Sequence, residues 1–89
     1  MITDFVSIIM AAYNAENTIE SAIHSVQKQT YQNWELLVVN DCSIDSTEEI
    51  VQSLASNDSR IRLLNNKTNS GVSISRKRGL NTAQGIWIA

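Results

Sequence analysis

Apolar runs and amphipathic stretches alternate along the chain, and their periods predict strands and helices in turn. Phe5–Ala12 and Trp34–Asn40 carry consecutive apolar residues, a pattern typical of strands buried on both faces. Arg60–Leu64 begins with alternating polar and apolar residues, which predicts a more exposed edge strand. Ile86–Ala89 is a short apolar run that predicts the start of a fourth strand.

Two of the intervening stretches carry helical spacing together with start signals. Asn17 with Glu20 forms a capping-box pattern, and we expect the helix behind it to run to about residue 29. Ser46 with Glu49 repeats the pattern at the start of a second helix. The expected buried faces consist of Ile19, Ala22, Ile23 and Val26 in the first helix and of Ile50, Val51 and Leu54 in the second.

A third helix is predicted over Val72–Gln84, with Gly85 at its C-terminal end. Its small residues Ser75, Gly79 and Ala83 form one stripe. A glycine inside a helix costs about 1 kcal/mol relative to alanine. We therefore expect Gly79 to permit close packing on the sheet.

The element order β-α-β-α-β-α-β predicts a single α/β domain with an open, parallel, Rossmann-like sheet in three α/β/α layers. We expect the final strand to lie beside the first. Because the chain stops inside an apolar run, we expect a truncated domain, with an open sheet edge that favours self-association and with Trp87 exposed.

Composition narrows the class of protein. The 89 residues are 43% hydrophobic and 18% charged, with a net charge of −2, which fits a globular domain and argues against a nucleic-acid binder. The single cysteine excludes an intramolecular disulfide and fits a reducing compartment. The N-terminal residues lack a basic region followed by a long apolar run, so we expect no signal peptide. No apolar run approaches the roughly 20 residues of a membrane span.

Several common α/β chemistries are excluded by motif. The only glycines are Gly71, Gly79 and Gly85, so neither a dinucleotide loop nor a phosphate loop with its Lys can be formed, and no GxSxG elbow occurs. No His, Cys, Asp and Glu residues have zinc-ligand spacing. His24 falls off the apolar face of its helix, and we expect it to be solvated.

Three residues suit a nucleoside. Asp41 follows the most apolar strand, where open parallel sheets place their ligands, and its carboxylate can accept the imide hydrogen of uracil. Tyr13 offers a ring for base stacking, and Arg76 can donate to a base carbonyl or to phosphate. The alternative is that Asp41 with its neighbours is an ordinary turn and cap.

Five blocks of sequence, in order, carry a resemblance to a known family. Val6–Asn14 is similar to VSVIIPAYN, Ser25–Tyr31 to SVLxQTY, and Glu35–Asp45 to ELIVVDDGSTD. The later blocks, similar to RIR…NxGxxxARNxG and AxGxYI, are Arg60–Arg62, Asn69, Gly71, Ser75, Arg76, Gly79 and Ala83–Ile88. Together these blocks resemble the N-terminal nucleotide-binding half of the GT-A family 2 glycosyltransferases.

The resemblance implies roles by position. The counterpart of Asp41 contacts the base, that of Tyr13 lines the base pocket, and that of Arg76 reaches the base or the phosphates. The implied nucleotide-binding set is Ala11, Ala12, Tyr13, Glu16, Asp41, Ser43 and Arg76.

Four positions depart from the family pattern. Ala11 replaces a proline, Asn40 the first acidic residue of the pair, and Lys77 an asparagine. Cys42 replaces a glycine, which leaves open whether the turn needs a positive φ.

The resemblance also implies a function. Residues 1–89 would be the nucleoside-recognising portion of an inverting glycosyltransferase that moves a hexosyl unit from an NDP-sugar, with a UDP-sugar favoured, to a saccharide or lipid-linked acceptor. A divalent cation, Mg or Mn, and the catalytic base would be held by parts outside this chain, so the 89 residues alone would be inactive.

Location and alternatives complete the expectations. The implied location is the cytoplasm or the cytoplasmic face of the membrane. Two alternatives remain open at this point: a non-catalytic nucleotide-binding or interaction module, and a nucleotidyltransferase.

Overall fold

The computed structural model describes residues 4–85, 87 and 88, and its sheet is parallel throughout. The strands lie in the order β3-β2-β1-β4. This confirms the predicted α/β fold, the edge position of the third strand and the place of the fourth strand beside the first. The elements are β1 (Val6–Ala12), α1 (Ile19–Lys28), β2 (Trp34–Asn40), α2 (Thr47–Asn57), β3 (Ile61–Asn65), α3 (Val72–Thr82) and β4 (Trp87–Ile88).

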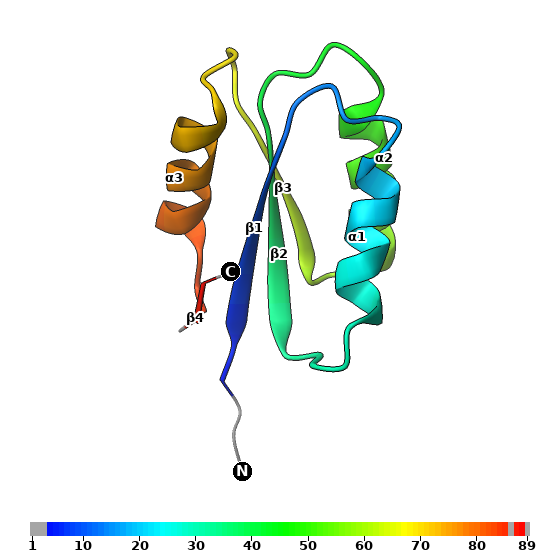
Figure 1. Cartoon of the computed structure of the whole chain (residues 1–89), viewed down its shortest axis with the longest axis vertical. Helices are drawn as coiled ribbons and strands as arrows, with labels where there is room; N and C mark the ends of the chain where they lie inside the picture. Colours follow the sequence, from blue (N-terminus) through cyan, green and yellow to red (C-terminus); the bar gives the residue numbers. More distant parts are fainter. Residues whose placement is uncertain (1–3, 86, 89) are drawn as a thin grey trace.

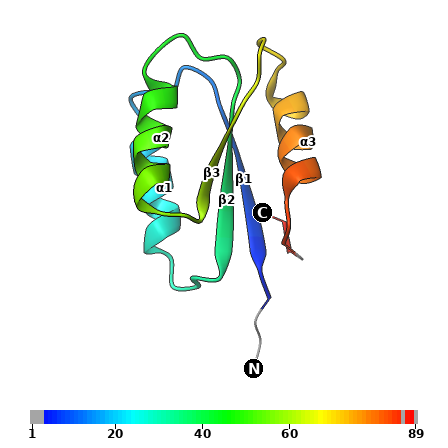
Figure 2. The same ribbon diagram turned by 180° about the vertical axis from the view of Figure 1, so that it is seen from behind.

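The sheet lies between two helical layers. Helices α1 and α2 cover one face and α3 covers the other, as the two opposite views show (Figures 1 and 2). All seven residues of β2 are buried, as its continuous apolar run predicted. Alternate residues point to opposite faces, so Trp34, Leu36 and Val38 pack in the core with α1 and α2.

Both predicted capping boxes are wrong. Helix α1 begins at Ile19, and its N-cap Thr18 makes no side-chain capping bond. The turn is closed by the backbone instead, because the carbonyl of Ala15 accepts the N–H groups of both Thr18 and Ile19. Ser46 is the N-cap of α2 but also makes no side-chain capping bond.

The end of the third helix also differs from the prediction. Helix α3 stops at Thr82, and Ala83, not Gly85, is its C-cap. Gly79 packs as predicted, since a Cβ there would stand 2.6 Å from Cγ2 of Ile9 on β1. Gly85 serves a similar purpose, because a Cβ there would stand 2.5 Å from the Oγ of Ser7.

A buried carboxylate joins the turn after α3 to the sheet. Glu35 on β2 is 4% exposed, and its Oε2 accepts the Ser7 hydroxyl at 2.6 Å and the Gln84 N–H at 2.8 Å. Arg62 of β3 approaches the other oxygen at 3.4 Å. Burial opposes ionisation, but these hydrogen bonds and the charge of Arg62 lower the pKa of Glu35 below its ordinary value. Sequence reasoning assigned Glu35 no role.

Part of the predicted fourth strand falls outside the described residues. Ile86 and Ala89, and the predicted exposure of the Trp87 side chain, lie outside the described part of the chain. Among the described residues, no helix has the length and apolar character needed to cross a membrane.

Candidate nucleotide-binding site

The loops that follow β1, β2 and β3 meet at one end of the sheet, the upper end in Figure 1. Parallel strands bring their carboxyl ends to the same edge, and this is where such sheets bind ligands. A small cleft of about 40 Å³ opens there. Its lining residues come from the end of β1, the end of β2 and the first turn of α3, namely Ala11, Ala12, Tyr13, Asp41, Val72 and Ser75.

Asp41 is the most constrained side chain of the cleft. It is 4% exposed, and its Oδ1 accepts the Ser70 N–H at 2.7 Å and the Asn66 amide at 2.9 Å. Its Oδ2 accepts the Gly71 N–H at 2.8 Å. The Ser70 and Asn66 donors lower the pKa of Asp41 below its usual value despite burial. The carboxylate therefore stays ionised and fixes the loop before α3.

Tyr13 contrasts with Asp41. Its side chain is 50% exposed at the mouth of the same cleft. The structure thus brings together the aromatic and acidic residues that sequence analysis proposed for a nucleoside.

A second set of predicted residues ties the two loops together. The Ser43 hydroxyl donates to Oδ1 of Asn40 at 2.5 Å and accepts the backbone N–H of Asn14 at 2.9 Å. Oε1 of Glu16 accepts the Ser46 N–H at 3.0 Å. Glu16 and Ser43 therefore lie at the same end of the sheet, but they brace the loops and do not line the cleft.

Ser46 occupies the N-cap position of α2 without a side-chain capping bond, whereas Asp45 supplies the side-chain hydrogen bonds at the start of this helix. Its Oδ1 accepts the Thr47 N–H at 3.0 Å and the Thr47 hydroxyl at 2.5 Å, and its Oδ2 accepts the Glu16 N–H at 3.2 Å. Burial opposes ionisation here, yet the Thr47 hydrogen bonds lower the pKa of Asp45 below its usual value. The carboxylate thus serves the helix and the neighbouring loop at once.

Arg76 lies on α3, one turn beyond Val72. It is exposed, and within residues 4–85 it makes no hydrogen bond or ion pair. Its role as a base or phosphate contact stays a prediction.

Sequence reasoning missed the residues that hold Asp41. Val72 and Ser75 line the cleft, and Asn66 reaches both Asp41 and Ser75. The signal available was the polar loop between the third strand and the third helix, together with the small-residue stripe of that helix.

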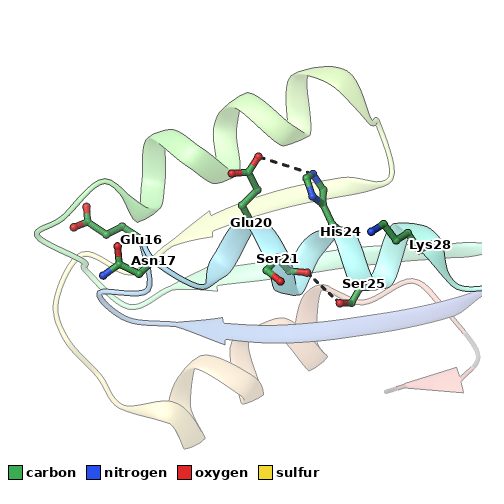
Figure 3. A pocket seen from close by; sticks show the side chains of 7 residues that line it. All are labelled: Glu16, Asn17, Glu20, Ser21, His24, Ser25 and Lys28. Carbon is green, nitrogen blue, oxygen red and sulfur yellow. Dashed lines mark hydrogen bonds and ion pairs between the residues drawn. The ribbon is translucent and has the colours of Figure 1, made fainter.

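A larger hollow of about 350 Å³ lies along the outside of α1 (Figure 3). It is an open polar surface, in which Glu20 and His24 stand 4.0 Å apart and the Ser25 hydroxyl donates to the carbonyl of Ser21. The His24 side chain is 44% exposed, as the predicted solvated position requires. No group of three or more potential metal ligands occurs in the described part of the chain. We therefore assign the smaller cleft, at the strand ends, as the candidate site.

Comparison with known proteins identifies the family. Residues 7–89 match the profile of Glycosyl transferase family 2. The chain belongs to this family. The resemblance carried by the five sequence blocks is thereby confirmed.

One relative is similar in sequence, and one solved structure is similar in fold. The chain is 52% identical over 84 residues to the Escherichia coli UDP-Glc:alpha-D-GlcNAc-diphosphoundecaprenol beta-1,3-glucosyltransferase WfgD, covering 94% of this chain and 32% of WfgD. The Staphylococcus aureus TarS 1-349 complex with UDP superposes with a TM-score of 0.86 at 32% identity, over 94% of this chain and 25% of TarS 1-349.

A third likeness shows the fold alone. The Pyrobaculum calidifontis mannosyltransferase PcManGT, in complex with GDP-Man and Mn²⁺, superposes with a TM-score of 0.88 at 24% identity, over 96% of this chain and 26% of that one. The chain spans about a third of the length of the curated relatives that it matches first.

Proposed function

We propose that this family 2 chain forms the nucleoside-binding part of a glycosyltransferase that uses a nucleotide-sugar donor, with a UDP-sugar as the preferred donor. One observation carries the proposal. An ionised, nearly buried carboxylate and an exposed aromatic ring share a cleft at the carboxyl ends of the strands. The nucleoside would place its base between Tyr13 and Asp41.

The hydrogen-bonding character of Asp41 defines which bases fit. An ionised carboxylate only accepts, so its ligand must present a donor. Uracil and guanine carry an N–H on the ring edge between their exocyclic groups, whereas cytosine presents a lone pair there. Stacking on an aromatic side chain adds about 1–3 kcal/mol for any base. Cytosine can donate only through its 4-amino group beside that lone pair, so we expect the site to bind UDP or GDP more tightly than CDP.

The relatives support UDP in this role. The name of WfgD specifies UDP-Glc, and TarS 1-349 was solved with UDP. Arg76 would contribute at the exposed end of the cleft, where a guanidinium can pair with phosphate oxygens.

The transfer step itself would be that of an inverting enzyme. A hydroxyl of a saccharide or lipid-linked acceptor, deprotonated by a carboxylate base, would attack the anomeric carbon and release the nucleoside diphosphate. The described residues do not supply a ligand set for a divalent cation, so we assign Mg²⁺ or Mn²⁺ and the base to other parts of the enzyme. The residues described here would bind and orient the nucleoside.

The test is calorimetric titration of UDP into the wild-type protein and two tyrosine variants. Tyr13→Ala should weaken UDP binding about tenfold, which corresponds to the loss of one stacking contact. Tyr31→Ala is the matched control, because Tyr31 is 42% exposed and its hydroxyl donates to the Asp4 carbonyl at the opposite end of β1. Its affinity for UDP should equal that of the wild type.

Two results would contradict the proposal. One is a wild-type protein that binds neither UDP nor GDP while thermal melting shows it folded. The other is an equal effect of the two tyrosine substitutions on UDP affinity, which would show that the base does not bind in the cleft.

A further inference from the structure

The Asp41 carboxylate belongs to a chain of hydrogen bonds that ends on an arginine. Nη1 of Arg78 on α3 donates to the Asn66 Oδ1 at 2.7 Å and to the Asn65 carbonyl at 2.6 Å. The Asn66 Nδ2 then donates to Oδ1 of Asp41 at 2.9 Å and to the Ser75 hydroxyl at 2.9 Å. Neither the family comparison nor the lining of the cleft assigns a function to this series of hydrogen bonds.

The direction of these bonds is fixed by chemistry. Arginine has only donors and an ionised carboxylate has only acceptors. Asn66 lies between the two, so only one orientation of its amide satisfies both neighbours: the oxygen toward Arg78 and the NH₂ toward Asp41. Arg78 is held in turn by the Asn65 carbonyl at the end of β3.

Three of the hydrogen bonds to Asp41 come from the loop before α3. Its Oδ1 already accepts two donors, whereas its Oδ2 accepts only the Gly71 N–H among backbone donors. The Ser75 hydroxyl, which lines the same cleft, also interacts with the Asp41 carboxylate. A hydroxyl can rotate, so the donor of a ligand can take the place of Ser75 at this carboxylate. A ligand N–H can be accepted there, and a ligand lone pair is repelled.

We propose that Asn66 and Arg78 are positioning residues that set the base specificity of the cleft, by holding Asp41 as a carboxylate that accepts hydrogen bonds and never donates them. This inference rests on the proposed function, and it adds two residues that do not touch the nucleotide. Their effect is on the choice between a base with a ring N–H, such as uracil, and one without, such as cytosine.

The pH at which UDP binding is lost on acidification gives a second measurement of how Asp41 is held. Removing the Asn66 donor removes one of the bonds that lower the pKa of Asp41. Asp41 should then protonate at a higher pH, and UDP binding should fail at a higher pH on acidification. The charged or titratable side chains on the elements around Asp41 are Tyr13, Cys42, Lys67, Arg76, Lys77 and Arg78.

The experiment compares UDP and CDP affinities across four variants. Asn66→Ala should lower UDP affinity about tenfold and leave CDP affinity unchanged, so the UDP/CDP ratio falls about tenfold. Arg78→Gln should lower the same ratio, because glutamine can donate or accept and no longer fixes the amide. Arg78→Lys should restore most of the ratio, since its ammonium still only donates. Lys77→Gln, an exposed residue of the same helix, is the matched control for charge and should match the wild type.

The outcomes separate this inference from the proposed function. If the wild type prefers UDP while the variants keep its UDP/CDP affinity ratio and lose UDP binding at the same pH, that result overturns the positioning role alone. Equal losses of UDP and CDP affinity assign Asn66 and Arg78 to folding and also overturn it. A wild type that binds no nucleotide overturns both proposals. If Asn66→Ala fails to fold, Arg78→Gln and an NMR titration of the Asp41 carboxyl carbon in ligand-free protein decide the matter.

Discussion

Cys42 has a backbone conformation that its side chain disfavours. Its φ is +61°, in the left-handed region, and it directly follows Asp41. The family pattern has glycine at this position, and the structure answers the question that the departure raised: the turn does need a positive φ. Among the described residues, Asn14 is the other non-glycine residue in this region, with φ +47°, and asparagine tolerates the left-handed conformation.

The strain at Cys42 predicts a stabilising substitution. A left-handed conformation costs an L-residue about 1–2 kcal/mol, and the greater freedom of unfolded glycine offsets about 0.5–1 kcal/mol of that. Cys42→Gly should therefore raise the free energy of unfolding by about 0.5–1 kcal/mol in urea titrations. Cys42→Ala keeps the Cβ and is the control. A glycine variant no more stable than the alanine variant would show that the turn is unstrained.

At the scale of elements, Glu35 links three strands to the turn that follows α3. Its two oxygens take donors from Ser7, Gln84 and Arg62, and the Ser7 oxygen accepts the Gly85 N–H at 2.7 Å. The lack of a Cβ at Gly85 permits this approach. The turn thereby sets where β4 begins, at its pairing of Trp87 with Val6.

Glu35→Gln should loosen this turn. Glutamine offers one acceptor oxygen, so its NH₂ group must face a donor, and a buried group left unsatisfied costs about 1–3 kcal/mol. We expect the free energy of unfolding at pH 7 to fall by that amount, with faster amide exchange at Gln84 and Gly85. Glu49→Gln, an exposed carboxylate on α2, is the control. Unchanged exchange in Glu35→Gln would mean that the backbone alone holds the turn.

At the scale of the whole molecule, one ion pair joins both helices of a layer to the sheet at the end opposite the cleft. Asp58, after α2, pairs with Arg60 at 2.9 Å and accepts the Gln27 amide of α1 at 3.2 Å. The Arg60 guanidinium lies 3.8 Å above the ring of Trp34 on β2. The Arg60 hydrogen bonds lower the pKa of Asp58 to about 2.

This shift predicts the acid sensitivity of the fold. A carboxyl group whose pKa is lower in the folded state stabilises it above the unfolded pKa, 3.8, and loses that contribution as the pH falls toward about 2. The contribution at pH 7 is about 2 kcal/mol. Urea titrations from pH 7 to pH 2 should show this loss in the free energy of unfolding of the wild type. In Asp58→Asn, the free energy of unfolding should fall less steeply with decreasing pH. Glu20→Gln, at a side chain that is 62% exposed, should keep the wild-type dependence on pH. An equal dependence of the free energy of unfolding on pH in Asp58→Asn and the wild type would show that this ion pair does not contribute to acid unfolding.

The sequence by itself determined the order of the elements, the doubly buried β2, the edge position of β3 and the packing of Gly79. Each of these depends on burial, and burial is recorded in the local period and size of side chains. The candidate residues Tyr13 and Asp41 could be found in the same way, because they directly follow apolar strands.

Only the tertiary structure decided which polar groups meet. The donors to Asp41 lie 25, 29 and 30 residues away, and Glu35 takes a donor 49 residues away. Local patterns indicated Ser46 as a cap, whereas Asp45 does this work because its second oxygen also has a donor in the loop after β1. A carboxylate pairs with whichever N–H groups the topology brings near, and the physical reason is that hydrogen bonds act only at contact, so their partners follow from the folded path of the chain.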